Sequence, residues 1–171
     1  MVRNVLLFCG ITSKKIYKPC NATYTRIWFG GDKMYTEKRA VVLACVTMQF
    51  ECDRIIKVAK QIADDTDCEL KVLSVLKPTH DYTEKAWQIE YLYMVSKEVD
   101  ADMTVLFDEN ADKAAANFAK KCNAQRIVTG LHDGGEESFL VGFNRLMPQM
   151  PLTMVAEDDM VYSMDVCKVC S

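Results

Sequence analysis

Apolar runs of strand length alternate with stretches of helical period between residues 40 and 156. Short continuous apolar runs are typical of strands buried on both faces of a sheet. Five such runs occur, at residues 41–46, 70–76, 103–107, 126–129 and 151–155. The stretches between them carry apolar residues three or four positions apart, which predicts helices with one apolar face. These helices are expected over residues 53–66, 83–98, 111–122 and 136–147.

The regular alternation of strand and helix predicts the fold class. Parallel strands can be joined only by a crossover, and crossovers of this kind are right-handed. We therefore expect an α/β domain with a doubly wound, five-stranded parallel sheet and helices on both faces. Ligands of such sheets bind at the carboxyl ends of the strands, where the strand order reverses. The loops after Val46, Leu76, Phe107 and Gly130 are thus the places to expect a site.

Two segments lie outside this regular pattern. Residues 1–39 hold two apolar runs separated by lysines and a proline, followed by a Gly-Gly-Asp turn. We interpret them as an N-terminal extension that forms either a hairpin or a loosely packed segment. Residues 157–171 are an acidic tail that ends in a CxxC motif. The chain is thus divided into residues 1–39, 40–156 and 157–171.

Composition excludes several classes of protein. The 171 residues carry a net charge of −3, so the basic surplus typical of nucleic-acid binding is missing. Half of the residues are apolar, which is too many for a disordered chain. No apolar stretch approaches the ~20 residues that cross a bilayer, so we expect no membrane partner. Most of the eight cysteines lie in apolar strand and helix patterns, where free cysteine packs as a small hydrophobic residue, and this predicts a reduced, cytoplasmic protein.

One glycine-rich segment could carry chemistry. The sequence GLHDGGEESFLVGFN, residues 130–144, follows a predicted strand and opens a predicted helix. Glycines there let the backbone approach a ligand, and a helix N-terminus presents free N–H groups to an anion. The alternative is a simple turn, with a glycine where two helices pack closely. No Walker A motif is present, and no glycine follows the first strand, which excludes the usual dinucleotide fingerprint.

The charges of this segment work against a highly charged anion. Asp133, Glu136 and Glu137 surround the expected helix N-terminus, and His132 is the only possible positive partner nearby. Carboxylates at this position interact favourably with the helix dipole themselves and so compete with an anion. Two like charges about 4 Å apart repel by ~1 kcal/mol in water, and several-fold more when partly buried. A triphosphate is therefore disfavoured unless a bound Mg²⁺ reverses the local charge.

Residues 40–156 resemble a universal stress protein domain. The likeness is closest to the divergent version in the cytoplasmic part of bacterial potassium-sensing histidine kinases. It is carried by TMQFECDRII at residues 47–56, by ADKAAANFA at 111–119, and by residues 130–142 with the strand PLTMV at 151–155.

The resemblance implies an adenine nucleotide alpha hydrolase-like fold, which is Rossmann-like, with five parallel strands in the order 3-2-1-4-5 and often a homodimer formed through the last strand. Some members bind ATP between the end of the first strand and the glycine loop, some bind none, and some kinase-attached domains are similar to receptors for cyclic dinucleotides. The expected ligand is accordingly ATP, AMP or a cyclic dinucleotide. The residues expected around it are Val46, Thr47, Gly130, His132, Asp133, Gly134, Gly142, Phe143 and Asn144.

The sequence departs from the ATP motif of that family. Gly130 and Gly142 match its outer glycines, but Asp133 stands where the second glycine belongs. Phe143 replaces the phosphate-binding Ser or Thr, and Thr47 stands where ATP-binding members carry an aspartate. The resemblance thus implies a degenerate ATP motif.

The CxxC motif at Cys167 and Cys170 permits a different kind of site. Its place at the carboxyl end argues against a thioredoxin-like role. As half of a zinc site it would need two further ligands, for which Cys9 and Cys20 are the candidates. Such a site would link the N-terminal extension to the C-terminal tail. The alternative is a frayed tail with two incidental thiols.

Catalysis has little support in the sequence. His80 lies in a loop of turn-forming residues, and His132 and Asp133 read as an exposed pair in a loop. We therefore expect no enzyme, but a nucleotide-sensing or stress-response regulatory domain. The alternatives are an interaction or dimerisation module without a ligand, and a zinc- or redox-responsive protein that uses the terminal cysteines.

Overall fold

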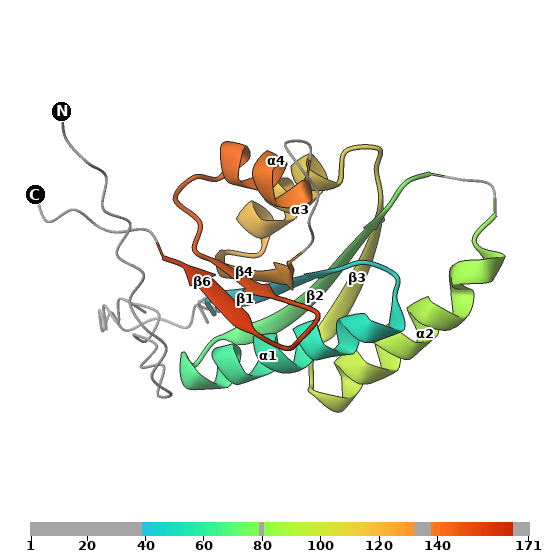
Figure 1. Cartoon of the computed structure of the whole chain (residues 1–171), viewed down its shortest axis with the longest axis horizontal. Helices are drawn as coiled ribbons and strands as arrows, with labels where there is room; N and C mark the ends of the chain where they lie inside the picture. The colour runs from blue at the N-terminus through green and yellow to red at the C-terminus, as the bar shows by residue number, and fades with distance from the viewer. Residues whose placement is uncertain (1–38, 79–80, 132–137, 166–171) are drawn as a thin grey trace, which may run out of the picture.

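A mixed sheet lies between two layers of helices (Figure 1). The computed structural model describes residues 39–78, 81–131 and 138–165. Within them the sheet has six strands in the order β3-β2-β1-β4-β5-β6. The strands are β1 (Val41–Val46), β2 (Glu69–Leu76), β3 (Asp102–Phe107), β4 (Ala124–Gly130), β5 (Leu152–Val155) and β6 (Val161–Met164).

The first five strands form the predicted parallel sheet. β1 pairs in parallel with β2 on one side and with β4 on the other, while β3 pairs with β2 and β5 with β4. Every residue of β1 is buried, as its continuous apolar run predicts for the central strand. The predicted order 3-2-1-4-5 is confirmed for these strands.

The sixth strand corrects the prediction of a five-stranded, wholly parallel sheet. β6 lies in the segment predicted as a tail and pairs antiparallel with β5. A tight turn joins the two strands, in which the Ala156 amide donates to the Met160 carbonyl and Asp159 has a positive φ of 62°. The sequence pattern does not predict β6, because this four-residue edge strand is mostly exposed and has no long apolar run.

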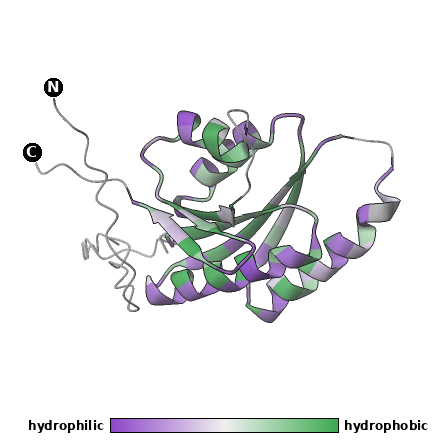
Figure 2. Ribbon diagram, viewed as in Figure 1, coloured by the Kyte–Doolittle hydropathy of each residue, from purple (hydrophilic) through white to green (hydrophobic). Residues whose placement is uncertain are grey.

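The helices cover both faces of the sheet, as predicted. α1 (Asp53–Asp65), preceded by a short 3₁₀ turn at Phe50–Cys52, and α2 (Thr83–Glu98) lie on one face. α3 (Ala111–Lys121) and α4 (Phe139–Leu146) lie on the other (Figure 1). The helices turn hydrophobic residues toward the sheet (Figure 2).

The pleat of β1 divides the core into two clusters. Val42, Ala44 and Val46 join the cluster under α1 and α2, which includes Ile56 and Leu92. The alternate residues Val41, Leu43 and Cys45 join the cluster under α3 and α4, which includes Ile127 and Phe143. Each fully buried large apolar side chain contributes about 1.5–3 kcal/mol, so the two clusters hold the three layers together.

The described segments add two further findings on the predicted organisation. None of the helices in residues 39–78, 81–131 and 138–165 has the length and apolar content needed to cross a bilayer. The predicted N-terminal extension lies outside the described residues except for Arg39.

Candidate functional site

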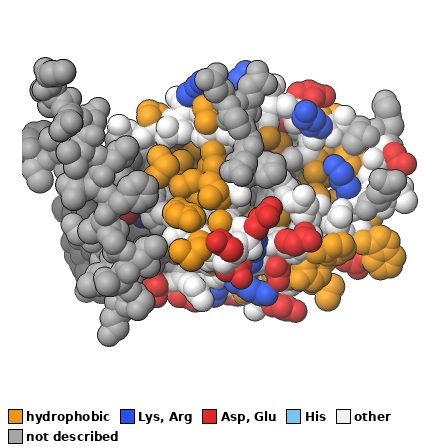
Figure 3. Space-filling model, in the orientation of Figure 1, with side chains coloured by type: hydrophobic (Ala, Val, Ile, Leu, Met, Phe, Trp, Pro, Cys, Tyr) orange, Lys and Arg blue, Asp and Glu red, His pale blue; other side chains and the backbone are white. Residues whose placement is uncertain are grey.

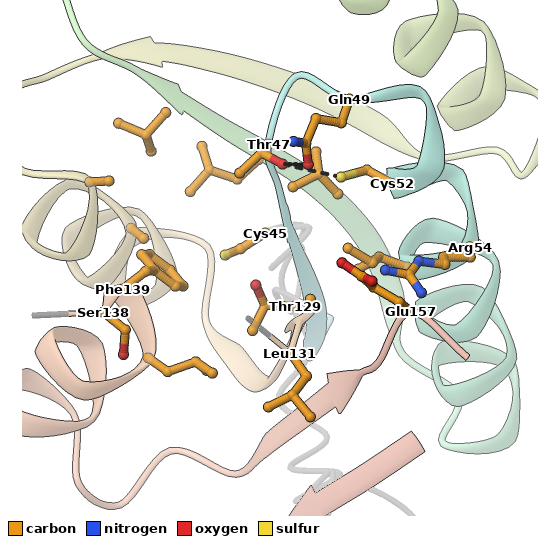
Figure 4. A pocket seen from close by; sticks show the side chains of 18 residues that line it. Cys45, Thr47, Gln49, Cys52, Arg54, Thr129, Leu131, Ser138, Phe139 and Glu157 are labelled. Carbon is orange, nitrogen blue, oxygen red and sulfur yellow. Dashed lines mark hydrogen bonds between the residues drawn. The ribbon is translucent and has the colours of Figure 1, made fainter. Parts of the chain in front are cut away.

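A cavity of about 470 Å³ lies at the carboxyl ends of β1 and β4 (Figure 4). The strand order reverses between these two neighbours, because β1 leads outward to β2 and β3 while β4 leads outward to β5. Ligands of open α/β sheets bind at this kind of reversal point. The volume is within the ~300–1,000 Å³ typical of small-molecule sites. The cavity is therefore the candidate site.

The end of β1 forms the first wall. Thr47, the exposed residue after this strand, donates its hydroxyl hydrogen to Oε1 of Gln49 at 3.0 Å. The same hydroxyl lies 3.3 Å from Sγ of Cys52, which is buried at the start of α1. These contacts orient the Thr47 hydroxyl at the mouth of the cavity.

The end of β4 forms the second wall, through Thr129, Gly130 and Leu131. A Cβ atom at Gly130 would lie 3.3 Å from Cδ1 of Ile55, so a glycine lets β4 pass close to α1 here. The Leu131 amide donates to the Val155 carbonyl at 2.8 Å and continues the ladder past the end of β4. The rim is thus held by backbone hydrogen bonds.

The third wall comes from α3 and α4. Ser138 is the N-cap of α4, and its Oγ accepts a hydrogen bond from the Val141 amide at 3.4 Å. Phe139 follows in the wall, and its ring packs against that of Phe143 with centroids 5.8 Å apart. Small side chains at Ala111 and Ala115 keep α3 from filling the cavity.

The inner surface of the cavity is mostly apolar. Leu73 and Val75 of β2 line it together with Ala115 and Phe139. A mostly apolar surface with a few polar groups is typical of small-molecule sites.

Two charged residues lie at the opposite side of the cavity from Ser138 and Phe139 (Figure 4). They are Arg54, in the first turn of α1, and Glu157, which follows β5. Nη1 of Arg54 donates a hydrogen bond to the Ala156 carbonyl. Nε of Arg54 is buried and has no hydrogen-bond partner.

Cys45, near the end of β1, is a buried thiol of the cavity wall. Burial, and secondarily the nearby Cys122, raises the pKa of its thiol to about 12. A thiol must ionise to act as a nucleophile. Cys45 therefore stays protonated near neutral pH and is unsuited to nucleophilic chemistry.

The structure brings three of the predicted site residues together. Val46, Thr47 and Gly130 all line the cavity. His132, Asp133 and Gly134 lie outside the described residues.

The last three predicted residues do not line the cavity and need correction. Gly142 faces α3, where an added Cβ would lie 2.4 Å from Oδ2 of Asp112, so this glycine serves helix packing. Phe143 is fully buried in the core, and Asn144 is exposed on α4. The helical turn carries these residues away from the wall that begins at Ser138.

Most of the wall was not predicted, including Ser138, Phe139, Arg54 and Glu157. The serine before an apolar run is an N-cap signal that could have marked the start of α4. Arg54 looked like one of several polar residues of α1, and Glu157 belonged to the predicted tail. No local signal joins these two residues, because they meet only through the folded sheet.

The predicted zinc site cannot be placed. Cys9, Cys20, Cys167 and Cys170 lie outside the described residues, so this site stays a prediction. Within the described ranges, Cys45, Cys52 and Cys122 are free thiols. No group of three or more His, Cys, Asp or Glu side chains suited to a metal occurs there.

Comparison by sequence gives no match, either to a protein-family model or to a curated protein. Comparison by structure, in contrast, finds proteins with a similar fold. A universal stress protein in complex with cAMP superposes with a TM-score of 0.55 at 14% identity, over 70% of this chain and 98% of its own.

Two structures from Archaeoglobus fulgidus agree with this result. The universal stress protein in complex with dAMP has a TM-score of 0.53 at 18% identity, over 68% of this chain and 96% of its own. Another universal stress protein structure has a TM-score of 0.51 at 16% identity, over 62% of this chain and 86% of its own. The specific link to potassium-sensing kinases stays a prediction. At these identities the likeness concerns the fold alone, and the described part of the chain has the fold of universal stress proteins.

Proposed function

We propose that this chain is a non-catalytic regulatory domain that binds a small adenine nucleotide, in the manner of a nucleotide sensor or stress-response protein. One observation carries the proposal. The ends of β1 and β4, at Thr47 and Gly130, share one cavity at the reversal point of the sheet. The apolar surface of Leu73, Val75 and Phe139 provides a place for a purine ring.

The structural neighbours support this choice of ligand. Two of the universal stress proteins with the same fold are complexes with cAMP and dAMP. Both ligands are adenine nucleotides with a single phosphoryl group. We therefore favour a monophosphate among the ligands that the sequence suggested.

The site offers less support for ATP. Phe143, at the position of the phosphate-binding Ser or Thr in the resemblance, is fully buried in the core. Thr47 brings no carboxylate to the mouth. Nucleophilic catalysis also lacks support, because the buried Cys45 thiol stays protonated.

A variant that fills the cavity tests the proposal. Ala111→Leu places a larger side chain at the α3 wall, and Ala86→Leu makes the same change at an exposed position of α2. By isothermal titration calorimetry with AMP, we expect the first variant to lose about five- to 150-fold in affinity, since overfilling a packed site costs about 1–3 kcal/mol. The second variant should bind like the unchanged chain.

Two outcomes would contradict this proposal. One is that neither AMP, cAMP, ATP nor a cyclic dinucleotide binds the unchanged chain. The other is that Ala111→Leu binds AMP as well as Ala86→Leu does. A nucleotide found by mass spectrometry in protein purified without added ligand would add independent support.

A second candidate is a dimerisation module without a ligand. It is favoured by the exposed apolar face of α2, where Trp87 is 76% and Met94 57% exposed. Hydrophobic side chains gather over this helix in Figure 3. Large exposed apolar patches mark association surfaces. Light scattering would then show a dimer that Trp87→Lys dissociates, whereas calorimetry would show no nucleotide binding.

A further inference from the structure

Arg54 is the single Lys or Arg side chain among the described residues of the cavity wall. The single carboxylate in the same wall is that of Glu157, so the described lining has no net charge. Among the described wall residues, Arg54 is thus the one cation that the phosphoryl groups of a ligand would meet.

The guanidinium of Arg54 is only partly used by the protein. It offers five N–H donors, of which one Nη1 hydrogen goes to the Ala156 carbonyl. Nε is buried without a hydrogen-bond partner. A buried donor without an acceptor destabilises the folded protein, and a ligand oxygen that accepts its hydrogen would remove this penalty. The bond to Ala156 spans 102 positions and joins α1 to the end of β5, so it holds the guanidinium at this rim of the cavity.

Asp53, the residue before Arg54, does not form an ion pair with it. Asp53 accepts hydrogen bonds from Lys57 at 2.7 Å and from Tyr91 at 3.3 Å. Glu157 is the remaining candidate, and Figure 4 shows its carboxylate beside the Arg54 side chain. No ion pair within 4 Å joins the two in the described part of the chain.

We propose that Arg54 recognises one phosphoryl group. The cavity would then bind a nucleoside monophosphate, linear or cyclic, in preference to both the nucleoside and the nucleoside triphosphate. This inference rests on the proposed function. The base would lie on the apolar side with Phe139, and the phosphoryl group at the opposite side with Arg54 (Figure 4). A guanidinium matches phosphate oxygens with two parallel hydrogen bonds. Glu157 beside it repels further phosphoryl groups and competes for Arg54 before the ligand binds.

The test is calorimetry on the full chain with adenosine, AMP, cAMP and ATP, the last with and without Mg²⁺. We expect AMP or cAMP to bind about ten- to a hundredfold more tightly than adenosine, the size of a hydrogen bond to a charged group. ATP should bind more weakly than the better monophosphate. The preference over adenosine should fall as salt is added.

Variants assign the preference to Arg54. Arg54→Met removes the charge and keeps the length of the side chain, and it should abolish the difference between AMP and adenosine while leaving adenosine binding unchanged. Lys57→Met removes a charge from the same helix outside the cavity wall and should leave the difference intact. Glu157→Gln should strengthen AMP binding. If Arg54→Met unfolds, Arg54→Lys is the second variant. It keeps the positive charge but cannot donate two parallel hydrogen bonds, so it should retain part of the preference for AMP over adenosine.

The possible results separate two failures. If adenosine and both monophosphates bind equally, or if Arg54→Met weakens all of them by the same factor, the role of Arg54 is overturned and the nucleotide site stands. If Glu157→Gln and Arg54→Lys leave the preference unchanged, the role is overturned as well. If none of these compounds binds the unchanged chain, the proposed function fails, and this inference fails with it.

Discussion

At the scale of single residues, the cavity depends on small side chains at its wall. Ala111 and Ala115 stand where larger side chains on α3 would fill the space, and Gly130 lets β4 pass close to Ile55 of α1. Cys45 lies in the same wall, buried, and its raised pKa keeps the thiol neutral near neutral pH. In the described part of the wall, neutral atoms thus surround most of the space, and the charged side chains lie on one side.

Cys45 should make the folded state sensitive to alkaline pH. Its pKa rises from 9.0 to about 12, so the folded protein keeps a proton that the unfolded chain releases above pH 9. The stabilising effect is therefore complete below pH 9 and is lost as the pH rises toward 12. Between pH 8 and pH 10 we expect the free energy of unfolding in urea to fall by about 1.4 kcal/mol more in the unchanged chain than in Cys45→Ala. An identical fall in both chains would contradict the assignment.

Residues of the site could be predicted where local pattern determines their place. Val46, Thr47 and Gly130 were expected because the position after a buried strand of a parallel sheet lies at its carboxyl edge. Arg54 and Glu157 could not be expected, since their proximity depends on how α1 packs beside β5. Phe143 was expected at the site because it matches a motif position. A motif match along the sequence does not show which face of α4 a residue occupies, and Phe143 lies on the face that is buried in the core.

At the scale of elements, α4 is positioned by close packing on α3. Gly142 supplies the point of approach, with the Asp112 side chain where its Cβ would be. The N-cap Ser138 fixes where the helix starts and so which residues face the cavity. The glycine therefore affects the site through helix position and not through contact with a ligand.

Gly142→Val should accordingly weaken the fold and leave ligand recognition intact. The branched side chain would force the two helices apart, which costs about 1–3 kcal/mol in the free energy of unfolding. Adding Asp112→Ala removes the obstructing side chain and should recover part of that loss. Urea unfolding measures both effects. A loss of AMP affinity in the folded variant, without loss of stability, would instead indicate a glycine that contacts the ligand.

Elements with strong periodicity were predictable, and exposed short ones were not. α2 has the bounds expected from its sequence, and the parallel strands lie within a few residues of their predicted positions. β6 carries only four residues, three of them exposed, so burial leaves no pattern in its sequence.

At the scale of the whole molecule, β6 changes which edge of the sheet is free. The resemblance implied a dimer through the last parallel strand, but β6 occupies the outer edge of β5. Hydrophobic side chains gather over β6 in Figure 3, and Tyr162 and Met164 are about half exposed, at 42% and 51%. Strand edges with exposed apolar residues favour pairing with another chain. A dimer through this side of the sheet would have to use β6 or displace it.

Removing β6 should therefore promote association. A chain that ends at residue 159 exposes the edge of β5, and we expect light scattering to show dimers or larger species at micromolar concentration. A chain that ends at residue 165 keeps β6 and serves as the matched control. Equal molar masses for the two truncated chains would show that β6 does not protect this edge.

A titration of the ¹⁵N-labelled protein with AMP, followed through the backbone amide signals, would show whether a nucleotide binds between the ends of β1 and β4. We expect shifts concentrated at Val46, Thr47, Gly130, Leu131 and Phe139, with saturation at one AMP per chain. Unchanged spectra at millimolar AMP, or shifts centred on α2, would contradict this expectation.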